Sequence, residues 1–174
     1  MPYTKLPTSK RLKFRHLTLN DVEVWSTFFE NNPNIHFVGR TFGPDNIANA
    51  TTWITRQIER YESVENTGLL VFEDKKTGEF IGQCGLMTRD IDGEQILEIG
   101  YHVLPKLWGN GYASEAAIAV KELAQKLKID QVVSMILPEN LASQKVAKRN
   151  DMTFWKNGKF GEFDVVIYRI YLRC

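Results

Sequence analysis

The sequence predicts an α/β (α+β) fold in which a mixed, mostly antiparallel sheet carries helices on both faces. The order of the segments is one basis for this prediction. A strand and two helices precede three strands joined by short turns, and a helix, a strand, a helix and two strands follow. The other basis is residues 96–127, where an apolar strand passes through Pro105 and two glycines into an alanine-rich helix.

The first part of the chain is predicted to form one strand and two helices. Around residues 12–16 apolar and charged residues alternate, as in a strand with one face inward. Residues 18–21, Thr-Leu-Asn-Asp, offer a capping residue with an acid three places later, and predict a helix that ends at residues 31–33, Asn-Asn-Pro. The helix after residue 45 has one apolar face, formed by Ile47, Ala50, Ile54, Ile58 and Tyr61.

Turn residues divide most of the remaining chain into strands. Residues 74–78, Asp-Lys-Lys-Thr-Gly, predict a hairpin between two apolar stretches, and Asp92-Gly93 predicts a turn into the central strand at residues 96–103. After the alanine-rich helix we expect a strand from residue 132 and a helix at residues 141–150. A final pair of strands is expected on either side of Asn157-Gly158.

Gly109 and Gly111 stand between the central strand and the alanine-rich helix. Glycine lets the backbone approach a ligand closely, and the first helical turn leaves N–H groups without internal partners. These donors and the helix dipole suit a phosphate or pyrophosphate, although a Gly-x-Gly also fits a plain loop. Two sharper phosphate motifs do not match. Tyr112 and Ala113 stand where the triphosphate-binding loop has Lys and Ser or Thr, and Ser114 stands where the dinucleotide fingerprint has its third glycine.

Composition restricts the class of protein. At 174 residues we expect a single domain over residues 1–174, and 43% apolar with 25% charged residues excludes disordered and fibrous classes. A net charge of +1 without a long basic block argues against a nucleic-acid partner. Cys84 and Cys174 have no metal-ligand or redox spacing, so no metal and a cytoplasmic location are expected. No apolar stretch approaches the roughly 18 residues of a membrane span.

Three segments together resemble the GNAT acetyltransferases. They are residues 98–101 (Glu-Ile-Gly-Tyr), 108–116 (Trp-Gly-Asn-Gly-Tyr-Ala-Ser-Glu-Ala) and 140–143 (Asn-Leu-Ala-Ser). Within that family the chain is most similar to the branch related to RimJ and RimL, which acetylate the N-termini of ribosomal proteins. The resemblance implies a sheet splayed at its central strands. It also implies an enzyme that moves an acetyl group from acetyl-CoA to a primary amine, by direct attack in a ternary complex.

The resemblance further implies where acetyl-CoA would lie. The glycine turn would hold its pyrophosphate, and the pantetheine arm would lie between the splayed strands, where backbone groups polarise the thioester carbonyl. Asn140, capping the next helix, would contact the pantetheine. The implied acetyl-CoA-binding residues are Tyr101, His102, Val103, Trp108, Gly109, Asn110, Gly111, Tyr112, Ala113, Asn140 and Ser143.

Glu98 and Ser143 are the expected catalytic residues. Glu98 is the leading candidate for the base that deprotonates the amine through a water molecule, although a strand carboxylate can equally pair with Lys or Arg. His102, on the same face of the strand, and bulk water are the alternative bases. By the resemblance, Ser143 stabilises or protonates the departing thiolate, since the tyrosine found on this helix in many GNAT enzymes is replaced by Ala147.

The acceptor amine is less well defined by the sequence. In this fold the loop between the first two helices and the C-terminal hairpin wall the acceptor pocket, here residues 33–45 and 156–162. The first loop supplies four substrate-binding candidates and a single acid, Asp45. A polyamine pocket needs carboxylates, so a peptide N-terminal α-amine or a small mono-amine is favoured. The four candidates are His36, Phe37, Arg40 and Phe42.

A second class of function stays open at this point. A protein of the same fold could bind acetyl-CoA as a sensor or partner-binding module without turnover. We expect a monomer or homodimer in either case. Retention of Glu98 and Ser143 favours the enzyme, because a protein without turnover could lose both.

Overall fold

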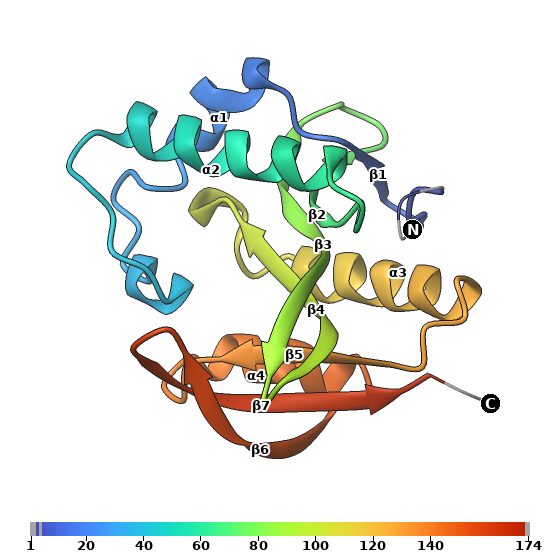
Figure 1. The fold of residues 1–174 in the computed structure, drawn as a ribbon. Helices are drawn as coiled ribbons and strands as arrows, with labels where there is room; N and C mark the ends of the chain where they lie inside the picture. Colours follow the sequence, from blue (N-terminus) through green and yellow to red (C-terminus); the bar gives the residue numbers. More distant parts are fainter. Residues whose placement is uncertain (1–2, 4, 173–174) are drawn as a thin grey trace.

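The computed structural model describes residue 3 and residues 5–172; Met1, Pro2, Thr4, Arg173 and Cys174 lie outside the described residues. Within that part of the chain, seven strands form one mixed sheet in the order β1-β2-β3-β4-β5-β7-β6. The helices α1 and α2 cover one face of the sheet, and α3 and α4 cover the other (Figure 1). The predicted fold class is confirmed.

The N-terminal elements are β1 (Leu12–Arg15), α1 (Val22–Ser26) and α2 (Asn46–Glu62), with 3-10 turns at Leu19–Asp21 and Ile35–Val38. The predicted cap is present, since the Asp21 carboxylate accepts the Thr18 N–H at 2.8 Å. The first helix is shorter than predicted. The hydroxyls of Ser26 and Thr27 donate to backbone carbonyls three residues earlier, which favours helix termination at this point.

The buried face of α2 differs from the predicted one. Ile47 is 49% exposed, whereas Trp53 and Gln57 are buried together with Ala50 and Ile54. Two hydrogen bonds explain the difference. Trp53 Nε1–H donates to the Gln83 Oε1 atom at 2.9 Å, and Gln57 Oε1 accepts the Leu69 N–H at 2.9 Å. Both side chains hydrogen-bond to the sheet, and these hydrogen bonds offset the cost of burying their polar atoms.

The central strands separate along their length. β2 (Gly68–Asp74), β3 (Phe80–Ile91) and β4 (Glu94–Val103) are antiparallel, and Asp92-Gly93 forms the predicted turn. β4 and β5 (Gln131–Ile136) are parallel and pair only at Leu97 with Val132 and at Glu98 with Val133. Beyond Glu98 the backbones part, which agrees with the splay implied by the family resemblance. A gap therefore opens in the middle of the sheet.

The last hairpin corrects one prediction. β6 (Thr153–Phe160) runs through Asn157-Gly158, and the turn to β7 (Phe163–Tyr171) lies at residues 161–162. Gly158 lies inside the strand, where a Cβ atom would lie 2.7 Å from Ile167 Cδ1 on the neighbouring strand. Phe160 thereby reaches the cavity described below.

Two helices flank the gap. α3 (Tyr112–Lys126) buries the predicted small residues Ala116, Ala117, Val120 and Ala124, which allow its backbone to approach the sheet. α4 (Leu141–Arg149) follows β5 and begins at Asn140. No helix in residues 3 and 5–172 has the length and apolar character needed to span a membrane.

Candidate functional site

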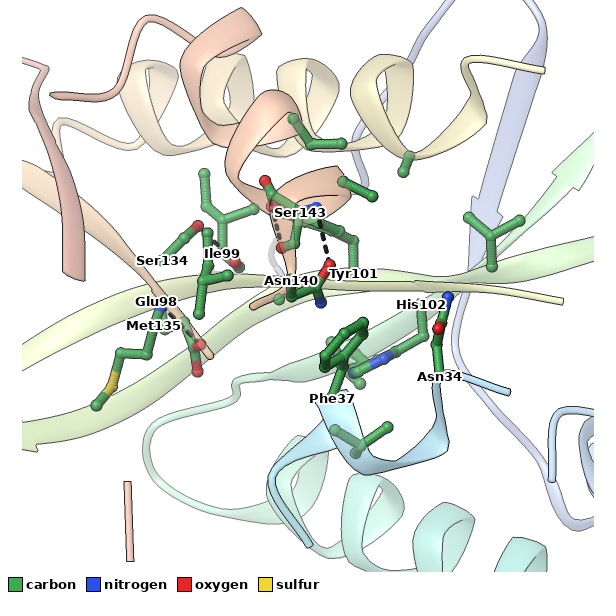
Figure 2. Close-up of a pocket in the computed structure, with 18 of the residues that line it drawn as sticks. Asn34, Phe37, Glu98, Ile99, Tyr101, His102, Ser134, Met135, Asn140 and Ser143 are labelled. Carbon is green, nitrogen blue, oxygen red and sulfur yellow. Dashed lines mark hydrogen bonds between the residues drawn. The ribbon is translucent and has the colours of Figure 1, made fainter. Parts of the chain in front are cut away.

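A cavity of about 550 Å³ occupies the gap between β4 and β5. Its wall is built from both central strands, the glycine turn, the start of α4, one side of α2 and the loop after α1. Side chains of β4 alternate between its two faces. Figure 2 shows Tyr101 on the same side of the strand as Ser143, whereas His102 lies on the other side with Phe37 and Asn34. The cavity therefore has one side formed by the start of α3 and by α4, and one formed by α2 and the loop after α1.

The glycine turn lies at one end of the cavity. Gly109 and Gly111 have φ angles of +82° and +77°, the left-handed region that disfavours other residues. α3 begins without a side-chain cap, and its first backward hydrogen bond joins the Glu115 N–H to the Gly111 carbonyl at 3.1 Å. The N–H groups of Tyr112, Ala113 and Ser114 are thus left open at the positive end of the helix dipole. This is an anion-binding geometry.

Side chains hold the turn in shape. Trp108 Nε1–H donates to the Val103 carbonyl at 2.8 Å, and Asn110 Nδ2–H donates to the Leu107 carbonyl at 3.0 Å. Arg11 was missed by the sequence reasoning. It pairs with Glu115 at 2.6 Å and donates to the Asn110 carbonyl at 3.1 Å. No local sequence pattern relates Arg11 to a turn about one hundred residues away.

Ser143 and Tyr101 form a hydroxyl pair at the start of α4. The Asn140 Oδ1 atom accepts the Ser143 N–H at 3.0 Å, so Asn140 is the N-cap expected from the sequence. Tyr101 Oη lies 2.9 Å from both the Ser143 carbonyl oxygen and Ser143 Oγ. Burial raises the pKa of the Tyr101 hydroxyl, which therefore keeps its proton. Only the backbone of Tyr101 was singled out from the sequence.

Glu98 is buried on the opposite side and forms an ion pair. Its Oε2 atom lies 2.5 Å from Arg89 Nε, and its Oε1 atom accepts the Met135 N–H at 3.3 Å. The pairing with a strand arginine, one of the alternatives left open above, is thus present. Glu98 also lines the cavity, so both a base and an anchoring role remain compatible with its position.

His102 lines the cavity between two aromatic rings. Its ring centroid lies 5.1 Å from that of Trp53 and 5.6 Å from that of Phe28. Burial, followed by the charges of Arg40 and Arg89, lowers the pKa of His102 to about 4. His102 is therefore neutral at physiological pH and a weak proton acceptor.

The lowered pKa of His102 predicts a pH-dependent stability. In the unfolded chain its pKa is about 6.5, so the unfolded state binds more protons between pH 6.5 and 4 and stability falls as the pH falls through this window. We expect His102→Gln to reduce by about 2 kcal/mol the loss of unfolding free energy between pH 7 and 5, measured by urea denaturation. Burial also lowers the pKa of His16, which does not line the cavity. His16→Gln, measured in the same way, therefore shows how much of the pH dependence comes from a histidine outside the cavity. An unchanged loss in His102→Gln would contradict the prediction.

The four acceptor candidates are divided by the structure. Phe37 and Arg40 line the cavity. His36 is exposed and contacts Phe37, with ring centroids 4.1 Å apart, while Phe42 packs against Phe29 at 4.9 Å, away from the cavity wall. Among the described residues, no group of three or more His, Cys, Asp or Glu side chains could hold a metal ion.

Comparison with known proteins places this geometry in a family. Residues 11–153 match the model described as "Acetyltransferase (GNAT) domain". The chain is 35% identical over 111 residues to the uncharacterized protein YkkB of Bacillus subtilis, a match covering 63% of this chain and 64% of that relative. The match thus spans less than two thirds of the length of YkkB.

Solved structures share the fold. An acetyltransferase from Agrobacterium tumefaciens is 27% identical with a TM-score of 0.77, and the match covers 97% of this chain and 96% of that one. The RimL ribosomal L7/L12 alpha-N-protein acetyltransferase in complex with coenzyme A is 18% identical, with a TM-score of 0.73 and coverage of 95% and 96%. An identity of 18% shows a shared fold only. The shared fold agrees with the resemblance to the RimJ and RimL branch. On the match of its residues 11–153, the chain belongs to the GNAT acetyltransferase family.

Proposed function

We propose that the protein is an N-acetyltransferase that uses acetyl-CoA and acetylates a primary amine, either a peptide N-terminal α-amine or a small amine. The observation that carries the proposal is one continuous cavity in the gap between β4 and β5. It joins the open N–H groups of the glycine turn to a hydroxyl pair on one side and a carboxylate on the other. In direct transfer from a thioester to an amine, the N–H groups can hold the donor, the hydroxyls can stabilise the leaving thiolate and the carboxylate can accept the proton of the amine.

The residues present fit coenzyme A. The N–H groups of Tyr112, Ala113 and Ser114 would hold the pyrophosphate, and Lys145 and Arg149 on α4 also line the cavity and would add positive charge. A Cβ atom at Gly109 would meet nothing within 4 Å, so the turn leaves space for a ligand. The RimL structure that shares this fold is a complex with coenzyme A. When bound, acetyl-CoA supplies the acetyl thioester, and the chain orients it and excludes water.

The two sides of the cavity would handle protons separately. On one side Glu98, held by Arg89, would accept a proton from the acceptor amine through a water molecule. On the other, Ser143 Oγ and Tyr101 Oη would hold protons where a departing thiolate can take one up. Tyr101 thereby supplies a phenol beside Ser143 on a helix where Ala147 replaces the tyrosine of many family members. We propose that Ser143 and Tyr101 act as a unit.

A pH profile of Glu98→Gln tests the proposal. An alkylammonium has a pKa near 10 and a peptide α-amine near 8, so at pH 7 only about one in a thousand or one in ten molecules is the free base. We expect Glu98→Gln to lower the rate of thiol release by about 10- to 100-fold at pH 7 and by less at pH 9.5. The rate of thiol release is measured from pH 6 to 9.5 with peptides and small amines as acceptors. The quantity compared is the ratio of the wild-type rate to the Glu98→Gln rate at each pH.

The outcomes separate the remaining possibilities. If the ratio of wild-type to Glu98→Gln rates stayed constant from pH 6 to 9.5, Glu98 would position the substrate. His102 or water would then be the base. Arg89→Gln, which breaks the same ion pair and keeps the carboxylate, controls for loss of structure. Acetyl-CoA binding without turnover of any acceptor would favour the sensor or partner-binding module.

A further inference from the structure

Four arginines line the side of the cavity that faces α1 and α2. Arg40 follows the 3-10 turn at Ile35–Val38, Arg56 and Arg60 lie one helical turn apart on α2, and Arg89 lies on β3. Among the described residues that line the cavity, Glu98 is the only acidic one. The wall therefore carries an excess of positive charge beside the proposed base, although the net charge of the whole chain is +1.

These arginines lie away from the glycine turn. Arg60 Nη1 is 3.6 Å from Met87 Sδ, and Met87 pairs with Glu98 in the sheet. Glu98 lies five residues before Val103, the end of β4 that leads into the glycine turn, and this separation is roughly 16 Å along a strand. Arg89 lies on the same face of the sheet as Met87 and Glu98. The arginines thus surround the acceptor side, whereas Lys145 and Arg149 come from the α4 side.

Within the described part of the chain, only one of these four arginines forms an ion pair, although the charge of Glu98 also acts on Arg40 and Arg60. Arg89 is paired with Glu98, but the partners of Arg60 are the neutral atoms Gln57 Oε1 and Met87 Sδ. Arg40 and Arg56 form no ion pair or hydrogen bond with another described residue. Arg40 and Arg60 are half-buried, whereas Arg56 is exposed. A half-buried cation without an ion pair costs stability, so it is rare where packing is its only role.

The pKa values of two of these arginines are lowered, as expected for half-buried guanidinium groups that lie near one another. Burial, and then the charge of Arg56, lowers the pKa of Arg40. Burial, and then the charge of Arg89, lowers the pKa of Arg60. The guanidinium groups are therefore close enough to repel one another. An oxyanion bound between them would relieve that repulsion and accept charge-assisted hydrogen bonds from several guanidinium forks.

We propose that the acceptor is an amine that also carries a carboxylate or phosphate group, which Arg40, Arg56 and Arg60 bind while Glu98 faces the amine. This rests on the proposed acetyltransfer and narrows its substrate class. It excludes polyamines as preferred acceptors, because their second cation would meet the arginines. It also excludes simple alkylamines, because they carry no anionic group for the arginines to bind. The carboxylate can belong to an acidic peptide, or the phosphate to a small amine, and matched acceptor pairs distinguish these sources.

The first experiment measures kcat/KM for thiol release with two acceptor pairs. One pair is a peptide with glutamates at its second and third positions and the same peptide with glutamines; the other is ethanolamine phosphate and ethanolamine. We expect the anionic member of at least one pair to be preferred by about tenfold or more. The Arg40→Gln/Arg56→Gln double variant should lose most of this preference. Lys126→Gln, which removes an exposed charge outside the cavity, should keep it.

The second experiment measures binding without turnover. Protein saturated with coenzyme A, which occupies the glycine turn, is titrated calorimetrically with ethanolamine phosphate and with the glutamate peptide. Binding that weakens about tenfold or more in the double variant supports the inference even if no acetyl transfer occurs, in which case only the proposed function fails. Equal or better use of the neutral acceptors, with binding unaffected in the double variant, would overturn the inference and leave the acetyltransfer intact.

Discussion

Replacing Gly111 with valine is expected to weaken acetyl-CoA binding by about 100-fold or more, or ~3 kcal/mol, since two or more charge-assisted hydrogen bonds to the pyrophosphate would be lost. Gly111 has a φ angle of +77°, where a β-branched side chain is strained, so the turn must change shape. The N–H groups at the start of α3 would then no longer converge. Calorimetric titration with acetyl-CoA measures the effect.

Gly78 provides a matched control for backbone strain. It has a φ angle of +74° in the hairpin between β2 and β3, away from the cavity. Gly78→Val should therefore lower the melting temperature without changing the affinity for acetyl-CoA. If folded Gly111→Val bound acetyl-CoA with wild-type affinity, the glycine turn would be a structural loop and the pyrophosphate would have to bind elsewhere.

Removing the Ser143 hydroxyl is expected to lower kcat by about 10- to 1,000-fold with little change in acetyl-CoA affinity, because the hydroxyl matters mainly as negative charge develops on sulfur. Ser143→Ala keeps the N–H that Asn140 caps, so α4 should begin at the same residue. The rate is measured in single turnovers, where the chemical step limits it.

The size of the loss of kcat in Ser143→Ala depends on Tyr101. Its hydroxyl lies 2.9 Å from Ser143 Oγ and can replace part of the lost function, so Tyr101→Phe combined with Ser143→Ala should be more damaging than either change alone. Tyr168→Phe is the control, since Tyr168 donates to Gln144 on the same helix at 3.0 Å but does not line the cavity. Wild-type single-turnover rates in the double variant would return both residues to a structural role.

The fold was predictable from sequence because its signals are local. Alternating residues in β1, the turn at Asp92-Gly93 and the small residues of α3 depend on a few neighbouring positions whose geometry follows from strand and helix periods. Predictions failed where a contact distant in sequence decided the outcome. Asn157-Gly158 resembled a turn, yet both residues pair with β7 inside a strand, and polar bonds to the sheet set the buried face of α2.

Some residues of the candidate site were predicted from the sequence, and others were found only in the structure. Gly109 and Gly111 were predicted from a local turn pattern, and Asn140 and Ser143 from the family resemblance of a short segment. Only the tertiary structure brings the Tyr101 hydroxyl to Ser143, Arg89 to Glu98, and the arginines of a loop, a helix and a strand to one cavity wall. The i, i+4 spacing of Arg56 and Arg60 placed them on one helix face but did not say what that face would meet. Side-chain proximity between elements depends on how the layers pack, and local periodicity does not encode that packing.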